Sequence, residues 1–102
     1  MSATIVQINL RFEGSKAEYL EAFSEAAAPI AATPGLRWKV WPWNDEERVG
    51  GGIYLFDDAE SAQAYLQGPI VAGLGQHPAV SDVSVQQFEV LESVTAVTRG
   101  PV

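Results

Sequence analysis

The chain has 102 residues, a length that fits one domain, and 47% of them are hydrophobic, as is typical of a folded globular protein. It has no cysteine and one histidine, which excludes disulfides, thiolate zinc sites and a multi-histidine metal site within one chain. The net charge of −7 disfavours binding to nucleic acid. We find no secretory signal and no run near the ~20 apolar residues that a membrane helix needs, so a cytoplasmic protein is expected.

Residues 4–12 alternate between apolar and polar side chains, which predicts a β-strand with one face in a core. The face expected to point inward carries Val6, Ile8, Leu10 and Phe12. The other face carries Gln7, Asn9 and Arg11, with Ile5 beside them. Such a mixed second face suits a contact with a partner chain or the lining of a cavity.

Two helices are expected. The first begins at a capping box formed by Ser15 and Glu18 and runs to about residue 32, with a kink near residue 26 because Pro29 falls inside it. The second begins at Asp57-Asp58 and ends at Gly68-Pro69. Residues 70–78 contain two glycines and a proline, and predict a loop or a short helical turn.

The stretch between the helices predicts a β-hairpin, with strands from about Leu36 to Trp43 and from about Arg48 to Phe56. Alternation places Leu36, Trp38, Val40 and Pro42 on one face, expected toward the helices, and Arg37, Lys39, Trp41 and Trp43 on the face expected toward a second chain. The run Gly50–Gly52 indicates a bulge or a close approach by a large group, for which the indole rings are the candidates.

Residues 79–91 form the last predicted strand, with a bulge near Gln86-Gln87, and residues 92–102 form a tail. The order β-α-β-β-α-β predicts one α+β, ferredoxin-like domain over residues 1–102, an antiparallel sheet with both helices on one face. The other sheet face is then too aromatic for water and too polar for a dry core. We therefore expect a homodimer that packs sheet to sheet.

Three segments together resemble the YdhR-like monooxygenase family. They are LRWKVW at residues 36–41, GGIYLF at residues 51–56 and DAESAQAYL at residues 58–66, and the tail VTRGP at residues 97–101 is also similar. The resemblance covers nearly the whole chain. It implies a dimeric α+β barrel and kinship with small oxygenases that convert phenolic aromatics to quinones without a cofactor, so no cofactor is expected.

Oxygenation without a cofactor needs a base, a polar group that stabilises the substrate anion, and a dry aromatic pocket. His77 is the first candidate base, because histidine alone titrates near neutrality unperturbed; the alternative is a surface residue before a proline. Arg11, Arg37 and Lys39 are candidates to stabilise a phenolate or enolate, with ion pairs across the dimer as the alternative. Asn9 is a candidate hydrogen-bond donor to the oxyanion. The predicted catalytic set is His77, Asn9 and Arg11.

Aromatic side chains are the candidate walls of a substrate pocket between sheet and helices, with core or interface packing as the alternative. The predicted substrate-binding residues are Phe23, Trp38, Trp41, Tyr54 and Tyr65. Three functions stay open on the sequence: a cofactor-independent monooxygenase for a small aromatic, a protein that binds a small apolar ligand without turnover, and a structural dimer.

Overall fold

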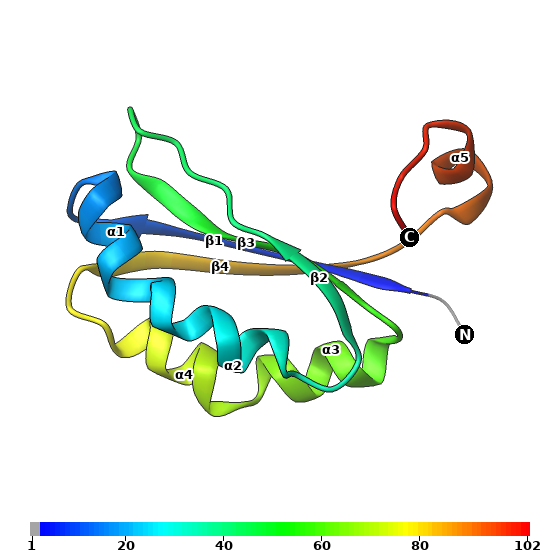
Figure 1. The fold of residues 1–102 in the computed structure, drawn as a ribbon, viewed down its shortest axis with the longest axis horizontal. Coiled ribbons are helices and arrows are strands. Elements are labelled where there is room, and N and C mark those ends of the chain that lie inside the picture. Colours follow the sequence, from blue (N-terminus) through cyan, green and yellow to red (C-terminus); the bar gives the residue numbers. More distant parts are fainter. Residues whose placement is uncertain (1–2) are drawn as a thin grey trace.

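A computed structural model describes residues 3–102, with α1 to α4 on one face of a four-stranded antiparallel sheet (Figure 1). The strands β1 (Thr4–Phe12), β2 (Leu36–Val40), β3 (Val49–Phe56) and β4 (Val80–Glu89) lie in the order β2-β3-β1-β4. The helices are α1 (Lys16–Phe23), the 3-10 turn η1 (Ser24–Ala26), α2 (Ala27–Ala31), α3 (Ala59–Leu66), α4 (Pro69–Gln76) and α5 (Glu92–Val97). The predicted α+β, ferredoxin-like fold is confirmed. None of these helices is long and apolar enough to span a bilayer.

Local signals in the sequence set where the helices begin and bend. The Ser15 hydroxyl accepts a hydrogen bond from the Glu18 amide at 3.2 Å, and the Glu18 carboxylate accepts one from the Ser15 amide at 3.0 Å, which confirms the capping box. The kink predicted near residue 26 is the 3-10 turn between α1 and α2, since Pro29 has no amide to continue the helical hydrogen bonds. The Asp58 carboxylate accepts from the Ser61 amide at 2.8 Å and begins α3.

Two segments are more regular than the sequence pattern predicted. Residues 69–76 form α4, where a loop or a single turn was expected. Pro69 stands in the first turn, where its missing amide removes no helical hydrogen bond, and Ile70, Val71 and Leu74 pack against the core. In the tail, residues 92–97 form α5, which lies beyond the end of the sheet near the N-terminal side of β1 (Figure 1).

The inner face of β1 is the centre of the core, as predicted. Val6, Ile8 and Leu10 are at most 1% exposed and lie beneath the helices, together with Tyr54 and Phe56 of β3. Burying an aliphatic side chain of this size contributes about 1.5–3 kcal/mol. The opposite face of the sheet, called the open face below, carries Ile5, Gln7, Asn9 and Arg11 of β1 and is not covered by α1 to α4.

A one-residue bulge in β2 reverses the predicted faces of that strand beyond its first residue. Leu36 pairs with Phe56, but Trp38 pairs with Leu55, so Arg37 is the extra residue. Arg37 leaves the ladder and donates from Nε to the Asp57 carboxylate at 2.6 Å. Because side chains alternate along a strand, one inserted residue exchanges the faces of everything after it.

The first consequence concerns Trp38, which was expected to face the helices. It packs instead on the open face, with Ile5 and Leu55. Its indole Nε1 donates a hydrogen bond to the Pro101 carbonyl at 2.8 Å, so it also holds the C-terminal tail against the sheet. The prediction that Trp38 points toward a pocket under the helices is wrong.

The second consequence concerns the residues expected to face a partner chain. Lys39 pairs with Tyr54 and therefore lies on the helix side of the sheet. β2 ends before Pro42, earlier than predicted, because proline has no amide to donate. Beyond the strand, Trp41 and Trp43 border hollows against α1. The predicted orientation of Lys39, Trp41 and Trp43 toward a second chain is therefore wrong as well.

The bulge in β4 also lies elsewhere than predicted. The register of β4 on β1 shifts by one residue around Asp82, whose φ is 51°, and runs unbroken through Gln86-Gln87. The prediction assumed that Val85 and Phe88 share a face. They pair with Ile8 and Ile5 and so lie on opposite faces, which requires no extra residue between them.

Candidate functional site

A cavity of about 290 Å³ lies between the sheet and the helices α1 to α4. Its lining is mainly aliphatic and aromatic, and the side chains that bear a ring or a charge are Tyr19, Phe23, Lys39, Trp41, Tyr54 and Tyr65. Sites for small ligands begin at about 300 Å³, so the space suits a molecule of one or two rings.

Lys39 is the one charged side chain among the described residues that line this cavity. Its Nζ lies 3.3 Å from the centroid of the Trp41 ring and 4.7 Å from that of Tyr54. Within residues 3–102, no carboxylate forms an ion pair with it. Burial lowers the pKa of Lys39 from its usual 10.5 to about 8. Near neutral pH the side chain is therefore mostly an ammonium, with an appreciable fraction of free amine.

Glycines in β3 make the room that these side chains occupy. A Cβ added at Gly52 would lie 2.5 Å from Cε of Lys39, and one at Gly50 would lie 2.8 Å from the ring of Tyr19. Gly51 has a φ of 136°, a backbone conformation that residues with a side chain rarely adopt. The close approach predicted from the three glycines is present, but Tyr19 and Lys39 make it and no indole ring does.

Tyr19 connects the helix layer to the sheet at the cavity wall. Its hydroxyl accepts a hydrogen bond from the Gly51 amide at 3.0 Å, and the residue is 5% exposed. Its ring stacks on Trp43 with 4.9 Å between centroids and packs against Phe23 at the same distance. Burial raises the pKa of Tyr19, so the hydroxyl keeps its proton and remains a hydrogen-bond donor.

Two further hydroxyls, those of Tyr54 and Tyr65, also belong to the cavity lining. The Tyr65 hydroxyl donates to the Tyr54 hydroxyl at 3.1 Å, and the two residues are 6% and 2% exposed. Burial raises the pKa of both, so both are neutral at physiological pH. The cavity thus offers one cation and neutral hydroxyls, but no carboxylate, to a bound molecule.

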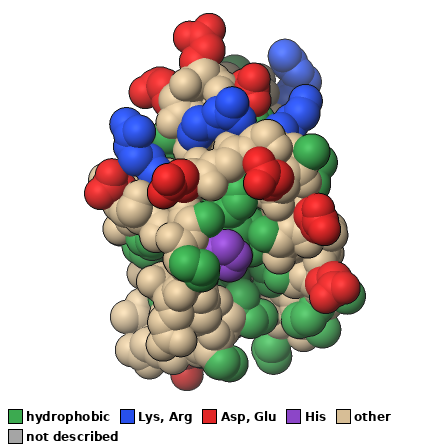
Figure 2. All heavy atoms as spheres, turned by 90° about the vertical axis from the view of Figure 1, so that its left-hand side faces the viewer, with side chains coloured by type: hydrophobic (Ala, Val, Ile, Leu, Met, Phe, Trp, Pro, Cys, Tyr) green, Lys and Arg blue, Asp and Glu red, His purple; other side chains and the backbone are tan. Residues whose placement is uncertain are grey.

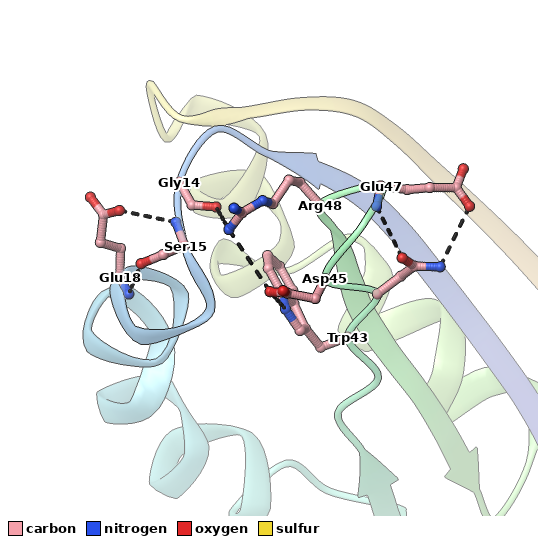
Figure 3. A network of polar contacts seen from close by, with 8 residues as sticks. Gly14, Ser15, Glu18, Trp43, Asp45, Glu47 and Arg48 are labelled. Atoms are coloured by element: carbon pink, nitrogen blue, oxygen red, sulfur yellow. Dashed lines mark hydrogen bonds and ion pairs between the residues drawn. The ribbon is translucent and has the colours of Figure 1, made fainter.

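The segment of residues 41–48 lies beside the start of α1 and is fixed there by polar contacts (Figure 3). Arg48 Nη1 donates to the Gly14 carbonyl at 2.9 Å and lies 3.9 Å from the Asp45 carboxylate. That carboxylate also accepts a hydrogen bond from Trp43 Nε1 at 3.1 Å. The network holds the Trp43 ring in place and thereby supports the Tyr19 ring on which it stacks.

His77, the predicted base, follows α4 and is not part of the cavity lining. Its ring packs 5.3 Å from Phe23 and 6.1 Å from Phe12, centroid to centroid. Its Nδ1 accepts a hydrogen bond from the Ala79 amide at 3.1 Å, which places the proton of the neutral ring on Nε2. Figure 2 shows this end of the molecule, where hydrophobic side chains surround the single histidine.

Asn9 and Arg11, the other two predicted catalytic residues, lie on the open face, so the sheet separates them from the cavity. The Asn9 Oδ1 accepts from Gln7 Nε2 at 3.5 Å, and Arg11 Nε lies 3.4 Å from the Asp82 carboxylate. The structure therefore does not bring the predicted catalytic set together with the predicted substrate-binding residues.

Four of the five predicted substrate-binding residues do line the cavity: Phe23, Trp41, Tyr54 and Tyr65. Trp38 does not. The sequence pattern missed Tyr19, although its place four residues before Phe23 puts both rings on one face of α1. Lys39 was considered as an anion-stabilising residue, but on the other face of the sheet.

The sheet order, with helices and a cavity on one face, defines a small ferredoxin-like α+β protein. The chain belongs to the family described as "Putative mono-oxygenase ydhR", whose model matches residues 5–101. The resemblance noted in the sequence is thereby confirmed.

Solved structures share the fold. SnoaB, a cofactor-independent oxygenase from Streptomyces nogalater, is 18% identical, with a TM-score of 0.72 over 92% of this chain and 98% of that one. NE2512, a protein of unknown function from Nitrosomonas europaea, is 24% identical, with a TM-score of 0.69 over 89% and 91% of the two chains. The heme-degrader MhuD from Mycobacterium tuberculosis, solved with two hemes in its active site, is 26% identical, with a TM-score of 0.63 over 85% and 95%. A comparison with curated proteins gave no match.

Proposed function

We propose that the chain is a cofactor-independent monooxygenase that oxidises a small phenolic aromatic in the cavity beneath the sheet. Family membership and the fold shared with a cofactor-independent oxygenase support the reaction class. The observation that carries the proposal is the placement of one ammonium, Lys39, without an ion-pair partner among residues 3–102, in an otherwise aromatic and aliphatic cavity.

The proposed reaction needs only substrate and dioxygen. A phenol with a free ring position reacts with O₂ to give a quinone and water, so the substrate supplies all the electrons. One atom of O₂ enters the ring as the new carbonyl oxygen and the other leaves as water. The step that the protein must assist is loss of the phenolic proton, because the electron-rich phenolate is the form that reduces O₂.

Lys39 suits that step in both of its protonation states. The free amine takes the phenolic proton, and the resulting ammonium then pairs with the phenolate. A pKa of about 8 keeps both states accessible near neutral pH. The hydroxyls of Tyr19 and Tyr54 are further donors on the cavity wall, since the Tyr65 hydroxyl already donates to Tyr54, and the rings of Phe23 and Trp41 keep water from the reacting carbon.

The catalytic roles predicted for His77, Asn9 and Arg11 stay predictions. A His77→Ala variant tests the base directly: unchanged turnover would remove it from the reaction.

The test is oxygen uptake with a panel of mono- and dihydroxylated one- and two-ring aromatics, with Lys39→Met and Lys39→Arg as paired variants. We expect uptake by the wild-type chain, its loss in Lys39→Met and a partial retention in Lys39→Arg, which keeps the cation but supplies no free amine. In parallel, binding of 4-nitrophenol reports on the cavity without turnover, because its phenolate absorbs visible light. Binding without oxygen uptake on any member of the panel would favour the ligand-binding function instead.

We further propose that two chains pair through their open faces. Phe88 on that face of β4 is 45% exposed, and Leu91, Val94 and Val97 in and before α5 are 59–76% exposed. Exposed apolar side chains such as these are unfavourable in water and suit a contact between two copies of the same surface.

A further inference from the structure

The amine of Lys39 has the surroundings of a reactive nucleophile. It is enclosed by two rings, it borders an apolar cavity open to small molecules, and it has no ion-pair partner within the described residues. A buried lysine with no carboxylate beside it loses its proton more easily than an exposed one, because burial disfavours the charged form, and the neutral amine is the nucleophile.

We propose that Lys39 captures small aromatic aldehydes in the cavity as imines, an activity separate from the oxygenation proposed above. The nitrogen lone pair attacks the carbonyl carbon and forms a C–N bond. Two N–H protons then move to the carbonyl oxygen, which leaves as water as the C=N bond forms. Neither an oxidant nor a reductant takes part.

The cavity selects this class of carbonyl compound. Its walls carry the rings of Phe23, Trp41 and Tyr65, which favour a flat aromatic ring over a charged or strongly hydrated molecule. The volume of about 290 Å³ limits the guest to one or two rings. Loss of water from the carbinolamine needs a proton donor, and the Tyr19 hydroxyl, which keeps its proton, is available on the same wall. The pKa of about 8 supplies free amine at neutral pH.

The chain contains two lysines, so Lys16 serves as an internal control for Lys39. Lys16 is exposed on α1, where it borders a separate hollow against Trp43, and reports the reactivity of an exposed amine outside the cavity. The full-length chain is incubated with benzaldehyde and sodium cyanoborohydride, which reduces an imine to a stable secondary amine, and peptide mapping by mass spectrometry assigns each adduct. We expect about tenfold more adduct on Lys39 than on Lys16, since burial lowers the pKa of Lys39 and the cavity beside it holds the aldehyde near the amine.

The variants Lys39→Arg and Lys16→Arg complete the experiment. The first should lose the dominant adduct and the second should keep it. 4-Nitrophenol should protect Lys39 and leave Lys16 unaffected. Equal labelling of the two lysines, or label on Lys16 alone, would overturn the proposal, and the wild-type ratio decides this even if a variant fails to fold. The readout needs no oxygen uptake, so it stands or falls separately from the proposed oxygenation.

Discussion

The hydroxyl of Tyr19 and the backbone amide of Gly51 are joined by a 3.0 Å hydrogen bond that runs from the helix layer to the sheet. Gly51 lies between the last pair of β2 with β3 and the isolated bridge that joins Asn44 to Val49, so β2 offers its amide no partner there. Tyr19 supplies that partner, which is a complete hydrogen-bonding arrangement for a buried amide. The bond also holds α1 against β3, and both elements line the cavity.

Tyr19→Phe should therefore destabilise the fold. The change leaves the Gly51 amide without an acceptor, which costs about 1–3 kcal/mol in the free energy of unfolding. Urea unfolding measures the loss, and faster hydrogen exchange of the Gly51 amide locates it. Tyr65→Phe is the matched control, because it removes a buried tyrosine hydroxyl that bonds Tyr54 and not the Gly51 amide, so the exchange rate of that amide should not change. An unchanged Gly51 exchange rate in Tyr19→Phe would contradict the assigned bond.

Gly51→Ala should be among the most damaging substitutions in the chain. The new Cβ would meet the carbonyl oxygen of Ile8, and the φ of 136° is unsuited to alanine. We expect a loss of about 3 kcal/mol in unfolding free energy. Gly75→Ala is the control within α4: its Cβ would meet nothing, so helix propensity should raise stability by up to about 1 kcal/mol. Equal effects of the two changes would contradict the close approach at Gly51.

The pKa of Lys39 predicts how stability depends on pH. The unfolded chain binds this proton more tightly than the folded one, with pKa values of 10.5 and about 8, so raising the pH through that interval stabilises the fold. Below pH 8 both states are protonated and the cost of the buried ammonium is constant. Lys39→Met should be more stable than the wild type by about 1–2 kcal/mol at neutral pH, with the gap closing toward about pH 10.

Urea unfolding across this pH range measures the gap, and the tyrosine contributions cancel because both chains carry them. Lys16→Met corrects for the general loss of one positive charge. A gap that stays constant with pH would show that Lys39 is well solvated.

The two sides of the sheet near β2 can be told apart by ligand binding. Trp41→Leu removes the ring against Lys39 and should weaken binding of 4-nitrophenol by about tenfold. Trp38→Leu removes an indole of similar size from the open face and should leave the affinity essentially unchanged, while releasing the tail that Pro101 anchors. Absorbance titration measures the first effect and limited proteolysis the second. The reverse pattern would restore the face assignment predicted from alternation.

The proposed pairing of open faces is tested with Phe88→Glu. A charge at the centre of an apolar contact should convert a dimer to a monomer, which sedimentation velocity measures. Ala17→Glu, on the exposed side of α1, is the control and should leave the assembly unchanged. A monomeric wild-type chain, or a Phe88→Glu variant that still pairs, would reject the proposal.

The sequence predicted those features that depend on short-range signals. Three such features are found in the structure: the capping box at Ser15, the kink caused by Pro29 and the alternation of β1. Each depends on residues that are close together in the sequence. The fold class followed from the order of these elements. The three glycines of β3 correctly indicated a close approach, but not which side chains make it.

The errors in β2 have one physical source: a prediction from alternation assumes that no residue is inserted into the strand. An extra residue at Arg37 is stabilised by its bond to Asp57, twenty positions away, and by the packing of Trp38 against the tail. The neighbouring residues in the sequence do not indicate these long-range contacts. For this reason the prediction placed Lys39 outside the cavity. The role of Tyr19 was missed because its partner Gly51 is distant in sequence.

The extra residue Arg37 in β2 determines which side chains line the cavity and which lie on the open face. Deleting Arg37 would turn the indole of Trp38 inward and carry the ammonium of Lys39 out to the open face. The cavity would lose its cation, and the opposite surface would gain a charge in the same event. A one-residue insertion or deletion in β2 would therefore change the side chains that line the cavity and those on the open face at the same time.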